Sequence, residues 1–219
     1  EQVYAGFSAA AVANHRQGYI NILVLPISFA SNPDSITPVE RQNYLRRAEQ
    51  RRLQIEQACK DAAPAGMVCS AVMAPILTRS DALDPNALQY FQGDLSAVFI
   101  LDGDQTTTMQ VINGTPVEVA LAQAYENGVI VAGTDGGGSI LSATLLAGYH
   151  PGFTAANSLN FGAVDLWNNS EKHGVSFGIR TAIFDQHIFE RGQLGRLLNA
   201  ITAPQAPHLG VGIDGFTGV

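Results

Sequence analysis

The chain has 219 residues, of which 46% are hydrophobic and 14% are charged, a composition typical of a globular protein. Its formal net charge is −7 and no run of like charge occurs, which argues against nucleic acid and anionic membrane surfaces as partners. No apolar stretch is long enough to span a bilayer, so we expect no membrane partner of that kind. This length suits one α/β domain covering residues 1–219.

The first third of the chain predicts a helix, a buried strand, a long helix and a second strand. Residues 3–14 are rich in small residues and predict a helix. Residues 19–27 form an apolar, β-branched run that is typical of a strand buried on both faces. Thr37 and Glu40 have the spacing of a capping box, which opens the long helix. Residues 67–77 predict the next strand.

The middle of the chain continues this alternation. Residues 95–101 predict a third strand. Thr115 and Glu118 repeat the capping-box spacing and open a helix that runs through Tyr125. An apolar strand beginning at Val129 then enters a glycine-dense turn, and residues 139–148 are predicted to be the helix that follows it.

The last third is less regular. Residues 150–174 are rich in Gly, Asn and His and predict a loop, whereas residues 175–184 have the character of a strand. A helix ending at Ile201 and a short strand over residues 209–213 complete the chain. Alternating strands and helices predict an α/β fold, a three-layer sandwich with a mostly parallel sheet and helices on both faces.

The most distinctive segment is the turn after Val129. The run Gly133-Thr134-Asp135-Gly136-Gly137 has the spacing of a nucleophile elbow, in which small residues flank one exposed, reactive side chain. An aspartate stands where such a turn normally carries serine. Asp135 is therefore the candidate nucleophile, although its reacting atom is a carboxylate oxygen.

Polar residues also gather where two other strands are predicted to end. These positions meet at one edge of a parallel sheet, where function in open α/β folds is concentrated. His187 is the candidate general base, and Gln105 and Gln186 are candidate hydrogen-bond donors to an oxyanion or a carboxylate. Arg191 and Arg196 are candidates to bind a carboxylate.

Each of these residues also has a structural interpretation. Asp185 can equally be a helix cap, Arg191 and Arg196 a solvated helix face, and His187 a structural histidine. The glycine turn resembles a weak phosphate loop, but it has no P-loop lysine. The five histidines are scattered, so we expect no metal site, and no motif indicates a cofactor.

The two cysteines allow two interpretations. Cys59 ends a predicted helix and Cys69 lies in the next predicted strand, so the pair can be a disulfide or two buried thiols. A disulfide favours an oxidising compartment, hence a secreted or periplasmic location, whereas free thiols leave a cytoplasmic one open. No signal peptide is visible, and we expect that an upstream segment has been removed.

Four segments together resemble the cyanophycinase and dipeptidase E group of serine peptidases, peptidase family S51. The resemblance covers most of the chain and is closest to the exported cyanophycinase-like proteins. The spacing of DQH, with arginines on the following helix, is its most specific part. It is carried by FILDGDQ (99–105), VAGTDGGGS (131–139), FDQHIFERGQLGRLL (184–198) and GVGID (210–214). The resemblance implies a fold like that of the class I glutamine amidotransferases.

The resemblance also implies roles for individual residues. In that family the elbow serine attacks a peptide carbonyl, which places Asp135 at the nucleophile position and His187 as the base. Arginines help to hold β-aspartyl-arginine units of cyanophycin, so the implied substrate is a peptide or a cyanophycin-like polymer. The implied pocket residues are Asp102, Gly103, Gln105, Asp185, Gln186, Arg191 and Arg196.

The chain departs from the family pattern around this one pocket. Asp135 replaces the serine, and Asp102 replaces the first glycine of a Gly-Gly-x-Gln turn. Gln193 stands where an arginine is expected, and Gly215 where a glutamate is expected. The family's opening strand and its later C-terminal strands have no counterpart in this sequence, which predicts unpaired sheet edges and a homo-oligomer that covers them.

Three hypotheses follow for function. The first is a pseudoenzyme, in which a peptidase fold is kept for binding or assembly. The second is an active serine-type peptidase that releases β-Asp-Arg dipeptides and uses another hydroxyl, that of Thr134 or Ser139. The third is a hydrolase in which the Asp135 carboxylate attacks a saturated carbon and forms an ester that water then opens.

Overall fold

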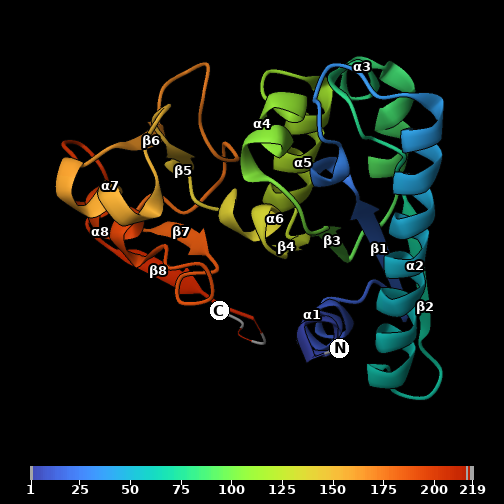
Figure 1. Ribbon diagram of the computed structural model, residues 1–219. Helices are drawn as coiled ribbons and strands as arrows, with labels where there is room; N and C mark the ends of the chain where they lie inside the picture. The colour runs from blue at the N-terminus through green and yellow to red at the C-terminus, as the bar shows by residue number, and fades with distance from the viewer. Residues whose placement is uncertain (1, 216, 218–219) are drawn as a thin grey trace.

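A four-stranded parallel sheet forms the centre of the computed structural model, which describes residues 2–215 and 217 (Figure 1). Neighbouring strands follow the order β2–β1–β3–β4, and all three pairings are parallel. The strands are β1 (Tyr19–Leu25), β2 (Val68–Met73), β3 (Ala97–Ile100) and β4 (Ile130–Gly133). Because every pairing is parallel, the carboxyl ends of β1, β3 and β4 open onto the same edge.

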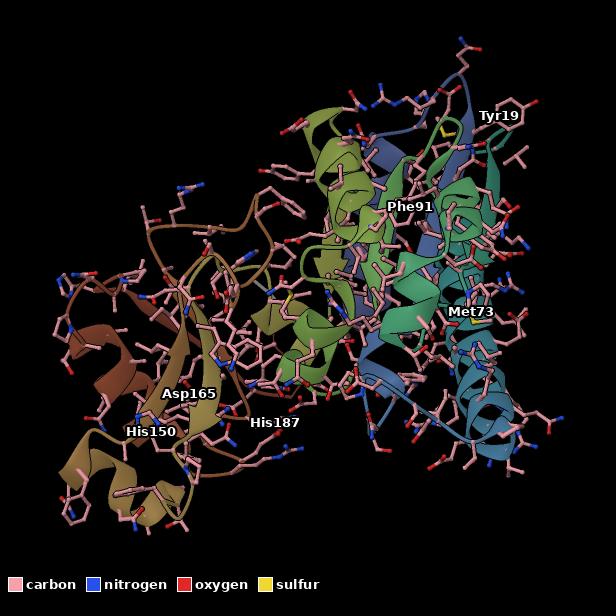
Figure 2. All side chains as sticks on the ribbon, turned by 90° about the horizontal axis from the view of Figure 1, so that it is seen from above. Tyr19, Met73, Phe91, His150, Asp165 and His187 are labelled. Carbon is pink, nitrogen blue, oxygen red and sulfur yellow. A yellow bond between two sulfur atoms is a disulfide. The ribbon has the colours of Figure 1, made fainter. Side chains whose placement is uncertain are left out.

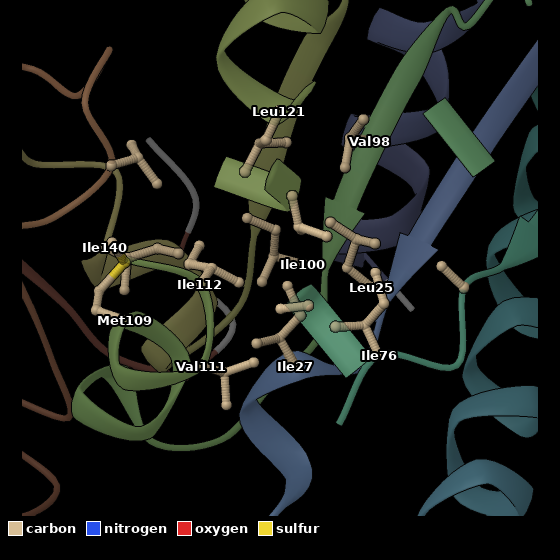
Figure 3. Packing of buried hydrophobic residues seen from close by; sticks show 14 of the residues in the cluster. Leu25, Ile27, Ile76, Val98, Ile100, Met109, Val111, Ile112, Leu121 and Ile140 are labelled. Carbon is tan, nitrogen blue, oxygen red and sulfur yellow. The ribbon is translucent and has the colours of Figure 1, made fainter. Parts of the chain in front are cut away.

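Helices cover both faces of this sheet. Helices α1 (Gln2–Ala13) and α2 (Pro38–Ala62) pack on one face, where Phe7 and Ile55 share a buried cluster with Phe99. The opposite face carries α3 (Arg79–Leu83), α4 (Gln105–Ile112) and α5 (Pro116–Glu126), with the 3₁₀ turns Ile27–Phe29 and Pro85–Phe91. Figure 3 shows this second core, in which Ile100 packs with Ile112 and Leu121.

Successive strand residues point alternately into these two cores. On β1, Ile22 and Val24 pack toward α1 and α2, whereas Leu23 and Leu25 pack toward α4 and α5. A strand buried on both faces has to be apolar at every position, which explains the continuous run seen in the sequence. The predicted α/β class, with a parallel sheet between two helical layers, is therefore what the structure has.

The C-terminal part is built around two smaller sheets. Strand β5 (Leu145–Tyr149) pairs antiparallel with β6 (Val164–Trp167), and β7 (Ile183–Gln186) pairs parallel with β8 (Gly210–Ile213). The helices here are α6 (Gly136–Ser139), α7 (Ala155–Phe161) and α8 (Leu194–Thr202). Leu146, Ile183 and Leu197 belong to one buried cluster, so these strands and α8 share a core.

The helix predicted over residues 139–148 is wrong. Only the four residues of α6 are helical, and the chain then becomes extended as β5. Long-range bonds replace the helical ones, because the N–H of Ala143 donates to Ile179 and its carbonyl accepts from Gly174. The predicted loop over 150–174 in turn contains α7 and β6, and most of the predicted strand 175–184 is irregular until Ile183.

Two strands end earlier than predicted. Strand β1 stops at Leu25, before Pro26, and β2 stops at Met73. The Thr37 capping box is confirmed, since Thr37 and Glu40 bond each other's backbone N–H groups. At the second box Thr115 accepts from the N–H of Glu118, but the Glu118 carboxylate accepts from the N–H of Gly114 instead.

None of the helices in the described part is long and apolar enough to cross a membrane.

A disulfide joins Cys59, near the end of α2, to Cys69 in β2, with their Cα atoms 6.0 Å apart. The bond ties the edge strand of the sheet to its covering helix and closes a short loop with a sequence separation of 10. Loop-closure entropy for a ring of that size is worth about 3 kcal/mol.

We therefore expect the double variant Cys59→Ala/Cys69→Ala to lose about 3 kcal/mol of unfolding free energy in urea titrations. Both cysteines are buried among apolar side chains, so alanine leaves no unsatisfied polar group behind. Reduction of the native chain with dithiothreitol is the matched measurement. Coincident unfolding curves for the oxidised and reduced chains would contradict the expectation.

Candidate active site

A sharp turn joins β4 to α6, and Asp135 sits at its apex with φ 48° and ψ −121°. The flanking glycines are required by space. A Cβ on Gly133 would lie 2.3 Å from the carbonyl oxygen of Gly137, and one on Gly136 would lie 2.3 Å from that of Gly103. The glycines in the sequence are therefore explained by close approaches between backbone segments, which leave no room for a larger residue. The turn lifts the Asp135 carboxylate above the carboxyl edge of the sheet.

His187 faces Asp135 from the end of β7. Its Nε2 lies 3.4 Å from Asp135 Oδ1, so the structure brings together the two residues that the sequence analysis placed at the centre of the site. Figure 2 shows His187 between the four-stranded sheet and the C-terminal part of the chain. His187 also has a positive φ, 53°, and its N–H is bonded to the carbonyl of Ile213. Backbone strain of this kind concentrates at functional sites.

Glu190 completes the arrangement, and the sequence analysis missed it. Its Oε2 lies 2.5 Å from Nδ1 of His187, on the side of the ring opposite Asp135. The available signal was the spacing of three residues from His187, which brings two side chains together when the intervening chain turns. Asp135, His187 and Glu190 thus form a continuous acid–imidazole–acid row.

The carboxylates of this row differ in their electrostatics. Burial raises the pKa of Asp135, and the nearby charges of His187 and Arg191 oppose that rise. The hydrogen bond from His187 lowers the pKa of Glu190, and the bond from the Gly215 N–H acts in the same direction. Glu190 is therefore the carboxylate held as an acceptor for the imidazole.

The two glutamines bond each other. Gln186 Nε2 donates to Gln105 Oε1 at 3.0 Å, and Gln105 Nε2 donates to the carbonyl of Leu146 at 3.2 Å. Gln105 is buried at the start of α4, where these bonds link it to β7 and β5. Gln186 also lines the cavity next to His187. Their catalytic and binding roles stay predictions.

Asp185 and Arg196 lie in the interior as an ion pair. The guanidinium of Arg196 donates from Nε and Nη2 to the two carboxylate oxygens, at 2.8 and 2.6 Å. Burial raises the pKa of Asp185, and the bonds from Arg196 oppose the rise. Arg191, in contrast, is exposed on the turn after β7. The Asp185–Arg196 pair anchors α8 to β7, directly beside His187. Contact of Asp185, Arg191 and Arg196 with a substrate stays a prediction.

Asp102 and Gly103 follow β3 at the same edge. Asp102 Oδ1 lies 3.9 Å from Arg51 Nε. Gly103 has φ 143°, and a Cβ there would lie 2.1 Å from the carbonyl oxygen of Ser28, so glycine is required. The carbonyl of Gly103 accepts the N–H of Gly136 at 3.1 Å. The backbone donor that follows the nucleophile position is therefore already paired.

A cavity of about 800 Å³ opens in front of this site. Its walls are mostly apolar and come from α1, β4 and the segment before β7, including Val3, Phe7, Val131 and Phe177. Its polar residues include Asp135, Gln186, His187 and Asp214. Among the residues that the structure describes, no group of three or more His, Cys, Asp or Glu side chains is arranged to hold a metal ion.

Comparisons with known proteins found relatives that match part of the chain. No family model matches the chain. It is 34% identical over 120 residues to the cyanophycinases of Trichormus variabilis and Nostoc sp., an alignment covering 54% of this chain and 37% of each relative. The cyanophycinase of Geminocystis herdmanii is 30% identical over 121 residues, covering 54% of this chain and 40% of the relative.

The matched region thus spans well under half the length of these curated relatives. Among solved structures, a peptidase from an acI-B1 Actinobacterium superposes with a TM-score of 0.63 and 14% identity, covering 97% of this chain and 73% of that one. This likeness concerns the fold. The chain is a distant homologue of cyanophycinases and has a peptidase-like α/β fold.

Proposed function

We propose that this chain is a cyanophycinase-like binding protein in which peptide cleavage has been lost. One observation carries the proposal. At the apex of the elbow, where a hydroxyl is needed for acyl transfer, stands the carboxylate of Asp135, 3.4 Å from the imidazole that would activate it. A carboxylate that attacks an amide carbonyl forms an anhydride and must expel an amine, which is unfavourable.

The backbone at the elbow supports the same conclusion. An oxyanion needs free N–H donors beside the nucleophile, but the N–H of Gly136 is bonded to the carbonyl of Gly103. Loss of a single oxyanion donor typically lowers kcat about 10²–10³-fold. The carboxylate of Asp102, at the same sheet edge, adds negative charge where an oxyanion would develop.

Two other hydroxyl residues, Thr134 and Ser139, line the same cavity as Asp135 and His187. Ser139 is buried, and the imidazole of His187 is already in contact with Asp135 and Glu190. Because both ring nitrogens of His187 already contact carboxylates, the site favours the binding role over the serine-type peptidase.

The cavity supports a peptide ligand that carries a cationic group. Its walls are apolar, and carboxylates of Asp135 and Asp214 stand at its polar end. A guanidinium or ammonium group entering there meets negative charge, and a β-Asp-Arg dipeptide has that chemistry. We also propose a secreted or periplasmic location, supported by the disulfide, and a homo-oligomer.

Incubation of the native chain with cyanophycin and with β-Asp-Arg dipeptides tests the proposal. We expect calorimetry to detect binding of the dipeptide and mass spectrometry to detect no cleavage. The control is Gly6→Trp, because Gly6 lines the cavity and a Cβ there meets nothing within 4 Å, so the indole fills the site. Turnover by the native chain would contradict the loss of activity, and binding equal to that of Gly6→Trp would contradict the ligand class.

A second candidate is favoured by the Asp135–His187–Glu190 row facing an apolar cavity. Attack of the Asp135 carboxylate on a saturated carbon would form an ester bond as the leaving group departs with its electron pair. Water, deprotonated by His187, would then open the ester. A single turnover of an alkyl halide or epoxide in ¹⁸O water would place label in Asp135, and an unlabelled Asp135 would exclude this chemistry.

A further inference from the structure

We infer that Glu190 is the positioning residue of the site: it holds the imidazole of His187 with Nε2 directed at residue 135. This inference rests on the proposed function, since it assigns a task within the same site. It also implies that the native chain retains a complete acid–imidazole pair, from which only the hydroxyl at position 135 is absent.

The contact itself is short and local. His187 and Glu190 lie in one turn, and the Nδ1–H of the ring donates to Oε2 at 2.5 Å. A carboxylate that accepts the Nδ1 proton decides the tautomer and orientation of the ring, which leaves Nε2 to exchange protons with the group in front of it. In this chain that group is residue 135, at 3.4 Å.

Glu190 is held in place, although its side chain is 46% exposed. Its second oxygen, Oε1, accepts the N–H of Gly215 at 3.0 Å. Its own N–H donates to Asp214 Oδ1 at 3.3 Å, and the N–H of Phe189 donates to the same oxygen at 3.0 Å. These three hydrogen bonds join the His187 turn to the segment after β8, which a solvated surface glutamate would not require.

Gly215 provides an independent observation. A Cβ at this position would lie 2.5 Å from Glu190 Oε1, so a side chain at 215 and the carboxylate of Glu190 compete for one space. The glycine has no positive φ in this structure, so turn geometry does not demand it. Glycine at 215 thus leaves room for the carboxylate of Glu190, and we expect a glutamate at 215 to take its place beside His187 when residue 190 is shortened.

The first experiment reads the contact directly in the otherwise native chain. In ¹⁵N-edited NMR spectra we expect a downfield, slowly exchanging Nδ1–H proton of His187. Glu190→Gln should remove it, and the relocating variant Glu190→Ala/Gly215→Glu should restore it. Glu126→Gln, an exposed glutamate at the end of α5, is the matched control. Persistence of the resonance in Glu190→Gln would overturn the inference.

The second experiment measures the consequence in an Asp135→Ser background. We expect Glu190→Gln to slow labelling of Ser at 135 by a fluorophosphonate about 10²–10⁴-fold, the usual contribution of an oriented base. The relocating pair should recover most of that rate, which a merely structural role would not do. Equal rates with and without Glu190 would overturn the inference. If the Asp135→Ser variant took no label while the Nδ1–H resonance of His187 persisted, the proposed function would be contradicted instead, because restoring the hydroxyl would not have restored reactivity.

Discussion

Replacement of Asp135 by serine is expected to give a chain that reacts with a serine-directed fluorophosphonate at position 135, whereas we expect the native chain to take no label. Serine keeps the backbone position at the apex and directs a hydroxyl, on a side chain one bond shorter, toward Nε2 of His187, from which the carboxylate oxygen now lies 3.4 Å away. An adjacent imidazole that accepts the hydroxyl proton is what activates such a nucleophile. Intact-mass spectrometry followed by peptide mapping measures the result.

Two variants make this result specific. Asp135→Asn removes the charge without adding a hydroxyl and should remain unlabelled. Asp135→Ser/His187→Ala keeps the hydroxyl but removes its base, so labelling should slow about 10²–10⁴-fold. If the native chain were labelled at Thr134 or Ser139, the proposal that hydroxyl chemistry has been lost would fail.

The same experiment separates the nucleophile from the oxyanion site. Phosphonate labelling is a single step on an activated reagent with a good leaving group, whereas peptide turnover must expel an amine and therefore depends more strongly on free N–H donors. Because the N–H of Gly136 is bonded to Gly103, we expect Asp135→Ser to be labelled readily and to cleave β-Asp-Arg peptides slowly. Fast peptide cleavage by this variant would show that the Gly136–Gly103 bond opens when substrate enters.

Arg196→Leu is expected to lower the free energy of unfolding by about 3–5 kcal/mol, the largest stability effect that the site region offers. The side chains of Asp185 and Arg196 are 1% and 8% exposed, and they are bonded through two hydrogen bonds. Removal of the guanidinium leaves a carboxylate in the interior without its counter-charge. Urea unfolding followed by circular dichroism measures the loss.

The double variant Asp185→Leu/Arg196→Leu is the critical comparison. Replacement of both partners leaves no isolated charge, so most of the stability should return. Arg180→Leu, at an exposed arginine, should change the free energy of unfolding by less than about 0.5 kcal/mol. A loss in the double variant as large as in Arg196→Leu would show that the pair acts through geometry and not through charge.

The sequence predicted the features that depend on neighbouring residues. Strands β1 and β3 were found because a strand buried on both faces must be apolar throughout, and that pattern is local. The elbow was found because only glycine fits around Asp135, where carbonyl oxygens approach within 2.3 Å of a would-be Cβ. The capping box at Thr37 is equally local, and it also formed as predicted.

Long-range pairing decided the rest. Residues 139–148 have helical character, but their backbone groups bond to Gly174 and Ile179, and Leu145–Tyr149 pairs with β6. The sequence did not decide whether the two cysteines form a disulfide, because that depends on how α2 packs against β2. Only the fold brings those Cα atoms to 6.0 Å.

By itself, then, the sequence determined the α/β class, the elbow and the presence of an acid at its apex, because each follows from spacing along the chain. Only the tertiary structure decided that His187 reaches Asp135, that Glu190 supports His187 from behind, and that Asp185 pairs with Arg196. These contacts depend on where β7 lies relative to β4 and on the positive φ of His187. These contacts arise from packing between segments that are distant in the chain, so they cannot be predicted from the spacing of residues along the sequence.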